Sequence, residues 1–229
     1  MTYAILIAIW VVWIFVQGAG LNEQQLAASV CNLGMVPGEL THLAPIGTAV
    51  PLGRGLSCVV DNDPINIFTP VISMFLHGGW GHIIGNSLFF WVFGNNIEDS
   101  MGSFRFLVFY LVCGLAAAGA HIIAQPASPL PTVGASGAIS GILGAYLVLY
   151  PRVRVRMLFL FFVVPIRAWL VLIWWFFWQL VAALPELTNG ADLTGGVAVW
   201  AHVGGFLTGV VLVKFFENPQ LVVRRTSAA

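Results

Sequence analysis

The sequence predicts an all-α membrane protein: a bundle of six transmembrane helices, with a long outer loop between the first and second helix. Of its 229 residues, 59% are hydrophobic and only 8% are charged, whereas a soluble domain has about 25% charged residues. Six hydrophobic segments also follow one another along the chain. A backbone in lipid must satisfy its own hydrogen bonds, which favours helices. The segments cover residues 3–18, 69–97, 104–123, 136–150, 166–184 and 196–216.

Three of these elements have features of their own. The first segment lacks the basic stretch that opens a signal peptide, so we expect it to remain as an anchor. The second is longer than one span requires, so its beginning should be a loop or an interfacial turn. Between the fourth and fifth segments, the apolar run 157–164 lies between arginines and Pro165, which favours a connection that dips into the interface. We expect one domain over residues 1–229, with its core at about 68–216.

The arginines and lysines predict the orientation of the chain. If the six helices alternate in direction, most of these residues reach the same side of the membrane, which the positive-inside rule makes cytoplasmic. Both termini are then cytoplasmic, including the basic tail at 217–229, and the loop at 20–68 faces outward. The expected location is a plasma (inner) membrane of the bacterial type. The residues on the cytoplasmic side are Arg105, Arg152, Arg154, Arg156, Lys214, Arg224 and Arg225.

Polar side chains within the predicted helices gather at one depth. Such residues are costly in a membrane and are therefore candidates for function. Counted at about 1.5 Å per residue from the inner helix ends, His82 and Ser136 lie at roughly 24 Å, and Asn86 and His202 at roughly 18 Å. In a hydrocarbon core about 30 Å thick, the four residues share one layer below the outer surface.

A serine and a histidine in this layer suggest nucleophilic catalysis. A neutral imidazole can accept the hydroxyl proton and later return it to a leaving amine. Ser136 opens a helix whose first N–H groups have no intrahelical acceptor, and His82 and Asn86 share a helix face, so these groups could stabilise an oxyanion. No acidic residue lies near this depth in the fourth or sixth segment. We therefore interpret Ser136 and His202 as a catalytic dyad.

Glycines in the fourth and sixth segments support a close approach of these two helices. Gly137 and Gly141 form one G-x-x-x-G step, and Gly205 and Gly209 form another. Small residues at this spacing let helix backbones come close together. A short serine side chain could then reach a histidine on the neighbouring helix.

Simpler roles stay open for each residue alone. A serine in the first turn is usually a helix cap, a lone membrane histidine could bond a neighbouring carbonyl, and Asn86 could simply join two helices. The aromatic cluster of the fifth segment most simply faces lipid. Alternatively, it forms a lateral gate that a substrate helix must displace, and smaller residues at Trp175 or Phe176 would then speed cleavage.

Together these motifs resemble the rhomboid family of intramembrane serine proteases. The resemblance is carried by GASG with Ser136, AHVGGFLTG with His202, HGGWGHIIGN with His82 and Asn86, FGNNIED, and the order of six helices. It implies that Ser136 is the nucleophile and His202 the general base, with His82 and Asn86 at oxyanion-stabilising positions. It also implies substrates that are transmembrane proteins, cut in or near their membrane segment.

The chain departs from the family pattern in two places. Many relatives carry an aromatic residue four positions after the nucleophile, stacked against the catalytic histidine, but this chain has Ser140. Other packing must therefore orient His202. The outer loop also lacks the Trp-Arg pair seen in part of the family. It contains Cys31 and Cys58 instead, which could form one disulfide in an oxidising exterior.

The sequence also limits cofactors and partners. It has no metal-ligand spacing and no glycine-rich phosphate loop, so we expect no cofactor and no metal. Its zero net charge argues against a nucleic-acid partner, which leaves transmembrane substrates and membrane lipid. The sequence disfavours two other functions. A rhomboid-like protein that binds without cutting should have lost the serine or the histidine, and a transporter using Arg167 should spread polar groups over the whole depth.

Overall fold

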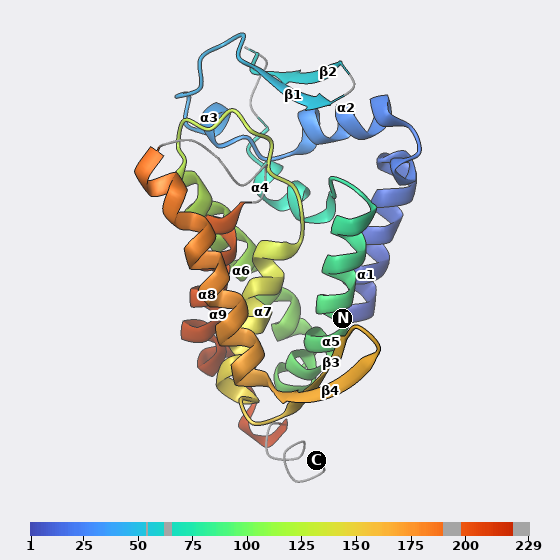
Figure 1. The fold of residues 1–229 in the computed structure, drawn as a ribbon, viewed down its shortest axis with the longest axis vertical. Coiled ribbons are helices and arrows are strands. Elements are labelled where there is room, and N and C mark those ends of the chain that lie inside the picture. Colours follow the sequence, from blue (N-terminus) through green and yellow to red (C-terminus); the bar gives the residue numbers. More distant parts are fainter. Residues whose placement is uncertain (54, 62–65, 190–197, 222–229) are drawn as a thin grey trace.

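The computed structural model describes residues 1–53, 55–61, 66–189 and 198–221. Its centre is a bundle of long helices that run along the length of the molecule (Figure 1). Each lies on a predicted hydrophobic segment, so the predicted positions of the helices are confirmed. They are α1 (Thr2–Val11, continued by a π-helical turn over Val12–Val16), α5 (Trp80–Met101), α6 (Ser103–Ala124), α7 (Ser136–Leu149), α8 (Ala168–Asn189) and α9 (Val199–Phe216).

The helices differ in length and polarity. Within the described residues, three stretches are long and apolar enough to cross a membrane: α6, the part Ala168–Pro185 of α8, and α9. The helical stretch Thr2–Val16 and α7 are apolar but shorter. The first two residues of the sixth predicted segment, and Arg224 and Arg225 of the tail, lie outside the described residues.

The predicted second segment begins with a turn rather than with its helix. A short helix, α4 (Thr69–Ile72), and a 3₁₀ turn (Ser73–Phe75) precede α5, which starts only after Gly79. Pro70 fits the first turn of α4 because proline lacks an N–H, and the Gly78-Gly79 pair favours a chain reversal before α5. The prediction of a loop or turn at this position is confirmed.

The chain is mostly helical, as expected, but its described residues also form two antiparallel hairpins at opposite ends of the bundle (Figure 1). One pairs β1 (Ala49–Gly53) with β2 (Leu56–Val59), and the other pairs β3 (Arg154–Phe159) with β4 (Phe162–Arg167). The first four residues of β3 alternate between basic and apolar, and β4 contains β-branched residues, both of which favour strands. The apolar run 157–164 thus forms the turn of this hairpin and the strand residues next to it.

The segment between α1 and α5 contains its own small elements. They are a 3₁₀ turn (Gly18–Gly20), α2 (Glu23–Leu33), α3 (Pro37–Leu40) and the β1–β2 hairpin, and they cover one end of the bundle (Figure 1). A disulfide between Cys31 and Cys58 joins α2 to β2, so the two cysteines between the first and second predicted helices do pair. The long connection is therefore folded.

Helix α7 occupies the centre of the bundle. All of its residues from Gly137 to Tyr146 are buried, and it packs most closely against α9. A Cβ atom on Gly209 would lie 1.9 Å from the Gly141 carbonyl oxygen, and one on Gly205 would lie 2.0 Å from that of Gly137. The two backbones touch, which confirms the predicted role of the glycines.

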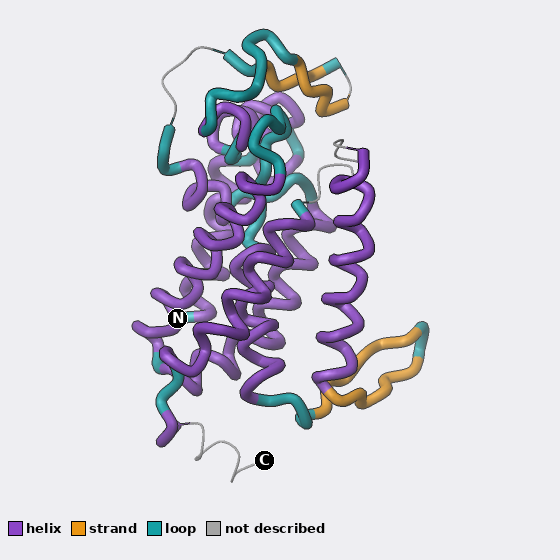
Figure 2. The backbone as a smooth tube through the Cα atoms, turned by 90° about the vertical axis from the view of Figure 1, so that its left-hand side faces the viewer, coloured by secondary structure: helices purple, strands orange, loops and turns teal. Residues whose placement is uncertain are grey.

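Helix α8 stands at the edge of the bundle, as Figure 2 shows. Only 17% of the residues in its apolar stretch Ala168–Pro185 are buried, compared with 39% for α9 and 44% for the apolar stretch of α6. Its inner face packs on α9 mainly through aromatic rings: Phe176 stacks on Phe206 with ring centroids 4.4 Å apart. By contrast, Trp174 is 62% exposed.

Candidate active site

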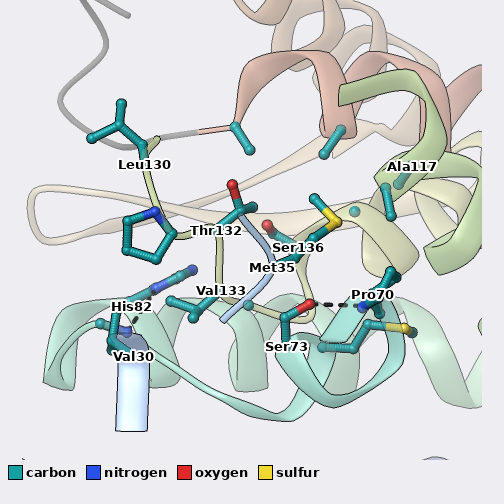
Figure 3. Close-up of a pocket in the computed structure, with 18 of the residues that line it drawn as sticks. Val30, Met35, Pro70, Ser73, His82, Ala117, Leu130, Thr132, Val133 and Ser136 are labelled. Carbon is teal, nitrogen blue, oxygen red and sulfur yellow. Dashed lines mark hydrogen bonds between the residues drawn. The ribbon is translucent and has the colours of Figure 1, made fainter. Parts of the chain in front are cut away.

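A cavity of about 890 Å³ lies at the end of the helix bundle that carries the β1–β2 hairpin. Ser136, His202 and His82 all line it, and Pro51 and Leu52 of β1 line it as well. Figure 3 shows the Ser136 hydroxyl near the middle of this cavity, with His82 and Thr132 beside it. Three of the four residues that the sequence places in one polar layer therefore meet at one cavity.

Ser136 and His202 are in direct contact. The distance between Ser136 Oγ and His202 Nε2 is 2.8 Å, which is within hydrogen-bonding range. Ser136 does not cap its own helix, because the N-cap position is Ala135 and no side chain caps it. The glycine contacts between α7 and α9 bring the two side chains together. This is the separation that a nucleophile and its general base require.

The beginning of α7 supplies backbone donors next to the serine. The first N–H with an acceptor in the same helical turn is that of Ile139, which bonds to the Ala135 carbonyl. The N–H groups before it have no acceptor within the helix, and the helix dipole makes this end positive. A developing negative charge beside Ser136 would be stabilised here.

His82 faces Ser136 across Gly134. The backbone N–H of Gly78 donates to His82 Nδ1 over 3.3 Å, so the ring proton is on Nε2. A Cβ atom at Gly134 would lie 2.7 Å from His82 Nε2 and 3.7 Å from Ser136 Oγ, and Gly134 has φ +126°. Only glycine leaves this space open. The Nε2–H group of His82 is thus a donor close to the serine.

Asn86 lies one helical turn further along α5. It is buried, and its side-chain amide donates to the carbonyl of His82 over 3.0 Å. Asn86 is not among the residues that line the cavity. Of the predicted oxyanion pair, the structure places His82 in the cavity lining together with Ser136 and leaves Asn86 outside that lining.

The loop before α5 is held by a residue that sequence reasoning did not single out. Gln17, at the end of the first helix, is buried, and its side-chain oxygen accepts from the backbone N–H of His77. Its amide nitrogen donates to the His77 carbonyl and to Ser29 Oγ. The His77 ring in turn contacts the His82 ring at 5.0 Å. This clamp fixes the start of the helix that carries His82.

The second ring nitrogen of His202 also has a partner that the sequence analysis missed. His202 Nδ1 lies 2.8 Å from Oε1 of Gln179 on α8, and the Trp175 ring lies 5.9 Å from the imidazole. Ser140 does not take the place of the family's aromatic residue, because its hydroxyl donates to the Ser136 carbonyl. A signal was available: Gln179 is the single amide side chain in the apolar stretch 168–184.

The site consists of groups that transfer protons and stabilise charge. Among the described residues, no three His, Cys, Asp or Glu side chains are grouped as metal ligands. A hydroxyl that is hydrogen-bonded to an imidazole, next to N–H donors, is an arrangement that can carry out acyl transfer.

Comparison with known proteins gives consistent matches. A family model described as Rhomboid domain matches residues 63–218. Rhomboid protease GluP of Bacillus subtilis (strain 168) is 38% identical over 104 residues, which are 45% of this chain and 19% of GluP. The matched part of Rhomboid protein 1, mitochondrial, of Saccharomyces cerevisiae is 29% identical over 144 residues, 61% of this chain and 39% of that protein.

A third relative comes from another compartment. Rhomboid-like protein 11, chloroplastic, of Arabidopsis thaliana is 34% identical over 74 residues, which are 31% of this chain and 25% of that protein. The chain thus spans from about a fifth to two fifths of the length of these curated relatives.

Proposed function

The chain belongs to the rhomboid family, and from this premise we propose that it is an intramembrane serine endopeptidase that cuts transmembrane proteins in or near their membrane segment. The observation that carries the proposal is the 2.8 Å contact between Ser136 Oγ and His202 Nε2 in a cavity that His82 also lines. A rhomboid-like protein that only binds its partners would have no need of this contact.

In the proposed reaction, Ser136 attacks the carbonyl carbon of the substrate peptide bond. His202 Nε2 accepts the hydroxyl proton as the new C–O bond forms, and the carbonyl becomes an oxyanion. The protonated His202 then donates this proton to the leaving amine, and the C–N bond breaks to give an acyl-enzyme. Water attacks the acyl group by the same route, with His202 again as the base, and releases Ser136.

The oxyanion is stabilised in this proposal by donors of two kinds. The first are the N–H groups at the beginning of α7, and the second is the Nε2–H of His82. Asn86 has the weaker position, because its amide is bonded to the His82 carbonyl and lies behind the cavity lining. We assign it a supporting role that holds α5 and His82 in place.

The membrane topology that we propose has six spans, with α1, α5, α6, α7, α8 and α9 crossing in turn and the whole chain forming one rhomboid domain. At about 1.5 Å per residue, α7 is roughly 21 Å long, which is shorter than a hydrocarbon core of about 30 Å. If its C-terminal end lies at the inner boundary, Ser136 is below the outer one. Water would then reach the serine through the cavity at the outer end.

The proposed orientation has both termini in the cytoplasm of a bacterial-type plasma membrane. The β3–β4 hairpin, whose sequence contains Arg154, Arg156 and Arg167, lies at the end of the molecule opposite the β1–β2 hairpin (Figure 1). Two residues of β1 line the cavity. Positive residues favour the cytoplasmic side, so the cavity opens outward. The substrate helix enters sideways past α8, which has the fewest buried residues of the three long apolar helices.

Labelling with a serine-directed fluorophosphonate tests this function. The purified protein should become labelled on Ser136 and should cleave a model transmembrane substrate, whereas Ser136→Ala and His202→Ala should do neither. Ser140→Ala is the matched control, because its hydroxyl lies one turn away in the same helix and should be dispensable. A folded wild-type protein that resists the probe and leaves every substrate intact would show that this chain is not a serine protease.

A further inference from the structure

We propose that Gln179 is a positioning residue for the general base: it sets the tautomer and the ring orientation of His202 from the neighbouring helix α8. This inference rests on the proposed protease function. Helix α8 would thus orient the His202 ring, a role that Ser140 cannot fill in this chain.

The two ring nitrogens of His202 have different partners, and these partners require one tautomer. Gln179 Oε1 lies 2.8 Å from Nδ1. An amide oxygen only accepts hydrogen bonds, so Nδ1 carries the ring proton. The lone pair of Nε2 is then free to face Ser136 Oγ, also at 2.8 Å. Only this tautomer can accept the proton of the serine hydroxyl.

The Gln179 contact also remains useful during the reaction. When Nε2 takes the serine proton, the imidazole becomes positively charged, and the Nδ1–H bond to the amide oxygen becomes charge-assisted. A neutral amide stabilises the imidazolium less than a carboxylate would. It is also less costly to place in a membrane, because it carries no charge.

A second residue of α8 supports the same ring. Trp175 lies one helical turn before Gln179, so both side chains are on one helix face. Its ring centroid is 5.9 Å from that of His202, with the planes tilted by 42°. In this chain, the ring contact and the hydrogen bond both come from α8.

This placement ties the base to the helix that would move when a substrate enters. Helix α8 stands at the edge of the bundle (Figure 2) and packs on α9 through the Phe176–Phe206 stack. If α8 shifts outward, Gln179 moves with it and Nδ1 loses its partner. The base is then fully oriented only when α8 has closed again. Closure that completes a catalytic arrangement in this way is a form of induced fit.

Kinetics of Gln179→Met test the inference, since methionine keeps the length of the side chain but has no strong acceptor. We expect kcat for a transmembrane substrate to fall about 10- to 100-fold with KM changed less than about twofold, because a group that acts in the chemical step is lost. The rate of fluorophosphonate labelling should fall in parallel. Gln179→Glu keeps an acceptor and should restore most of the rate. Leu180→Met, the adjacent half-exposed position, should behave like the wild type.

A spectroscopic measurement on the wild-type protein tests the tautomer without any change to α8. In protein labelled with ¹⁵N-histidine, the His202 signals, identified by their loss in His202→Ala, should show a protonated Nδ1 and an unprotonated Nε2. The opposite tautomer, or full-rate turnover by folded Gln179→Met, would overturn the role of Gln179. A wild-type protein that neither reacts with the probe nor cleaves would instead contradict the protease function itself.

Discussion

Helix α9 has two faces that are built in opposite ways. Towards α7 it presents Gly205 and Gly209, and the two backbones come into direct contact. Towards α8 it presents Phe206 and His202, which meet aromatic rings and the amide of Gln179. The first face consists of glycines, which have no side chain that could change its rotamer. The second face consists of side chains that can change rotamer.

In the proposed mechanism, the difference separates two requirements of the catalytic dyad. The distance between serine and histidine must be constant, and backbone contact between α7 and α9 fixes it, because close-packed helices cannot approach or slide without clashes. The orientation of the imidazole depends on α8, which is largely exposed. A bilayer enzyme that admits a substrate helix between its own helices can loosen the second contact while it keeps the first.

The largest effect should come from disturbing the glycine face. A Cβ on Gly209 would lie 1.9 Å from the Gly141 carbonyl oxygen, so Gly209→Ala must push α9 away from α7. A displacement near 1 Å can cost about 100-fold in rate, and we expect a loss of cleavage of this order together with a lower Tm. Gly119→Ala on α6 is the control, since nothing lies within 4 Å of its Cβ position. Equal turnover by the two variants would mean that the glycine contact does not set the dyad.

An intermediate effect is expected at the proposed oxyanion donors, which lie outside the contact between α8 and α9. Loss of one such donor costs roughly 10²–10³-fold in soluble proteases, and we expect His82→Ala to lower kcat by less than this, about 30-fold, because the N–H donors at the beginning of α7 remain. Asn86→Ala should cost less than about tenfold, because Asn86 does not line the cavity. The measurement is single-turnover cleavage of the same membrane substrate by both variants. A larger loss for Asn86→Ala would reverse the two assignments.

The smallest effect, and the one of opposite sign, should come from the aromatic face. Phe176→Ala removes the ring that stacks on Phe206 at 4.4 Å, so α8 should separate from α9 more easily. We expect cleavage at low substrate concentration to rise a few-fold while Tm falls by several degrees. Trp174→Ala, at a position that is 62% exposed, is the control and should change neither quantity. A slower Phe176→Ala enzyme would argue against entry beside α8.

The positions of the helices and half of the site can be predicted from regular spacings along the sequence. The helical rise, counted from charged ends, is enough to place Ser136 and His202 in one layer, and the glycine spacing predicts that their helices touch. Both arguments need only distances along a helix. The same arithmetic also puts Asn86 in the layer, but it carries no information on which way a side chain points, so it cannot separate Asn86 from His82.

The rest depends on contacts between segments that are far apart in the sequence. Gln179 meets His202 only because α8 has a particular rotation against α9, and its polarity alone does not identify a partner. Trp175 and Phe176 have similar bulk, yet only Trp175 contacts the imidazole as well as Phe206. The β3–β4 hairpin was missed because an apolar run between arginines is compatible with either a strand pair or an interfacial segment.

The disulfide between Cys31 and Cys58 makes the entrance of the site depend on redox chemistry. It ties β2 to α2, and the paired strand β1 contributes Pro51 and Leu52 to the cavity lining. Disulfides form and persist where thiols are oxidised. In the proposed orientation, this entrance would be locked only after the segment had crossed to an oxidising side. A chain kept reduced would carry the same serine and histidine beneath an entrance that no covalent bond holds in place.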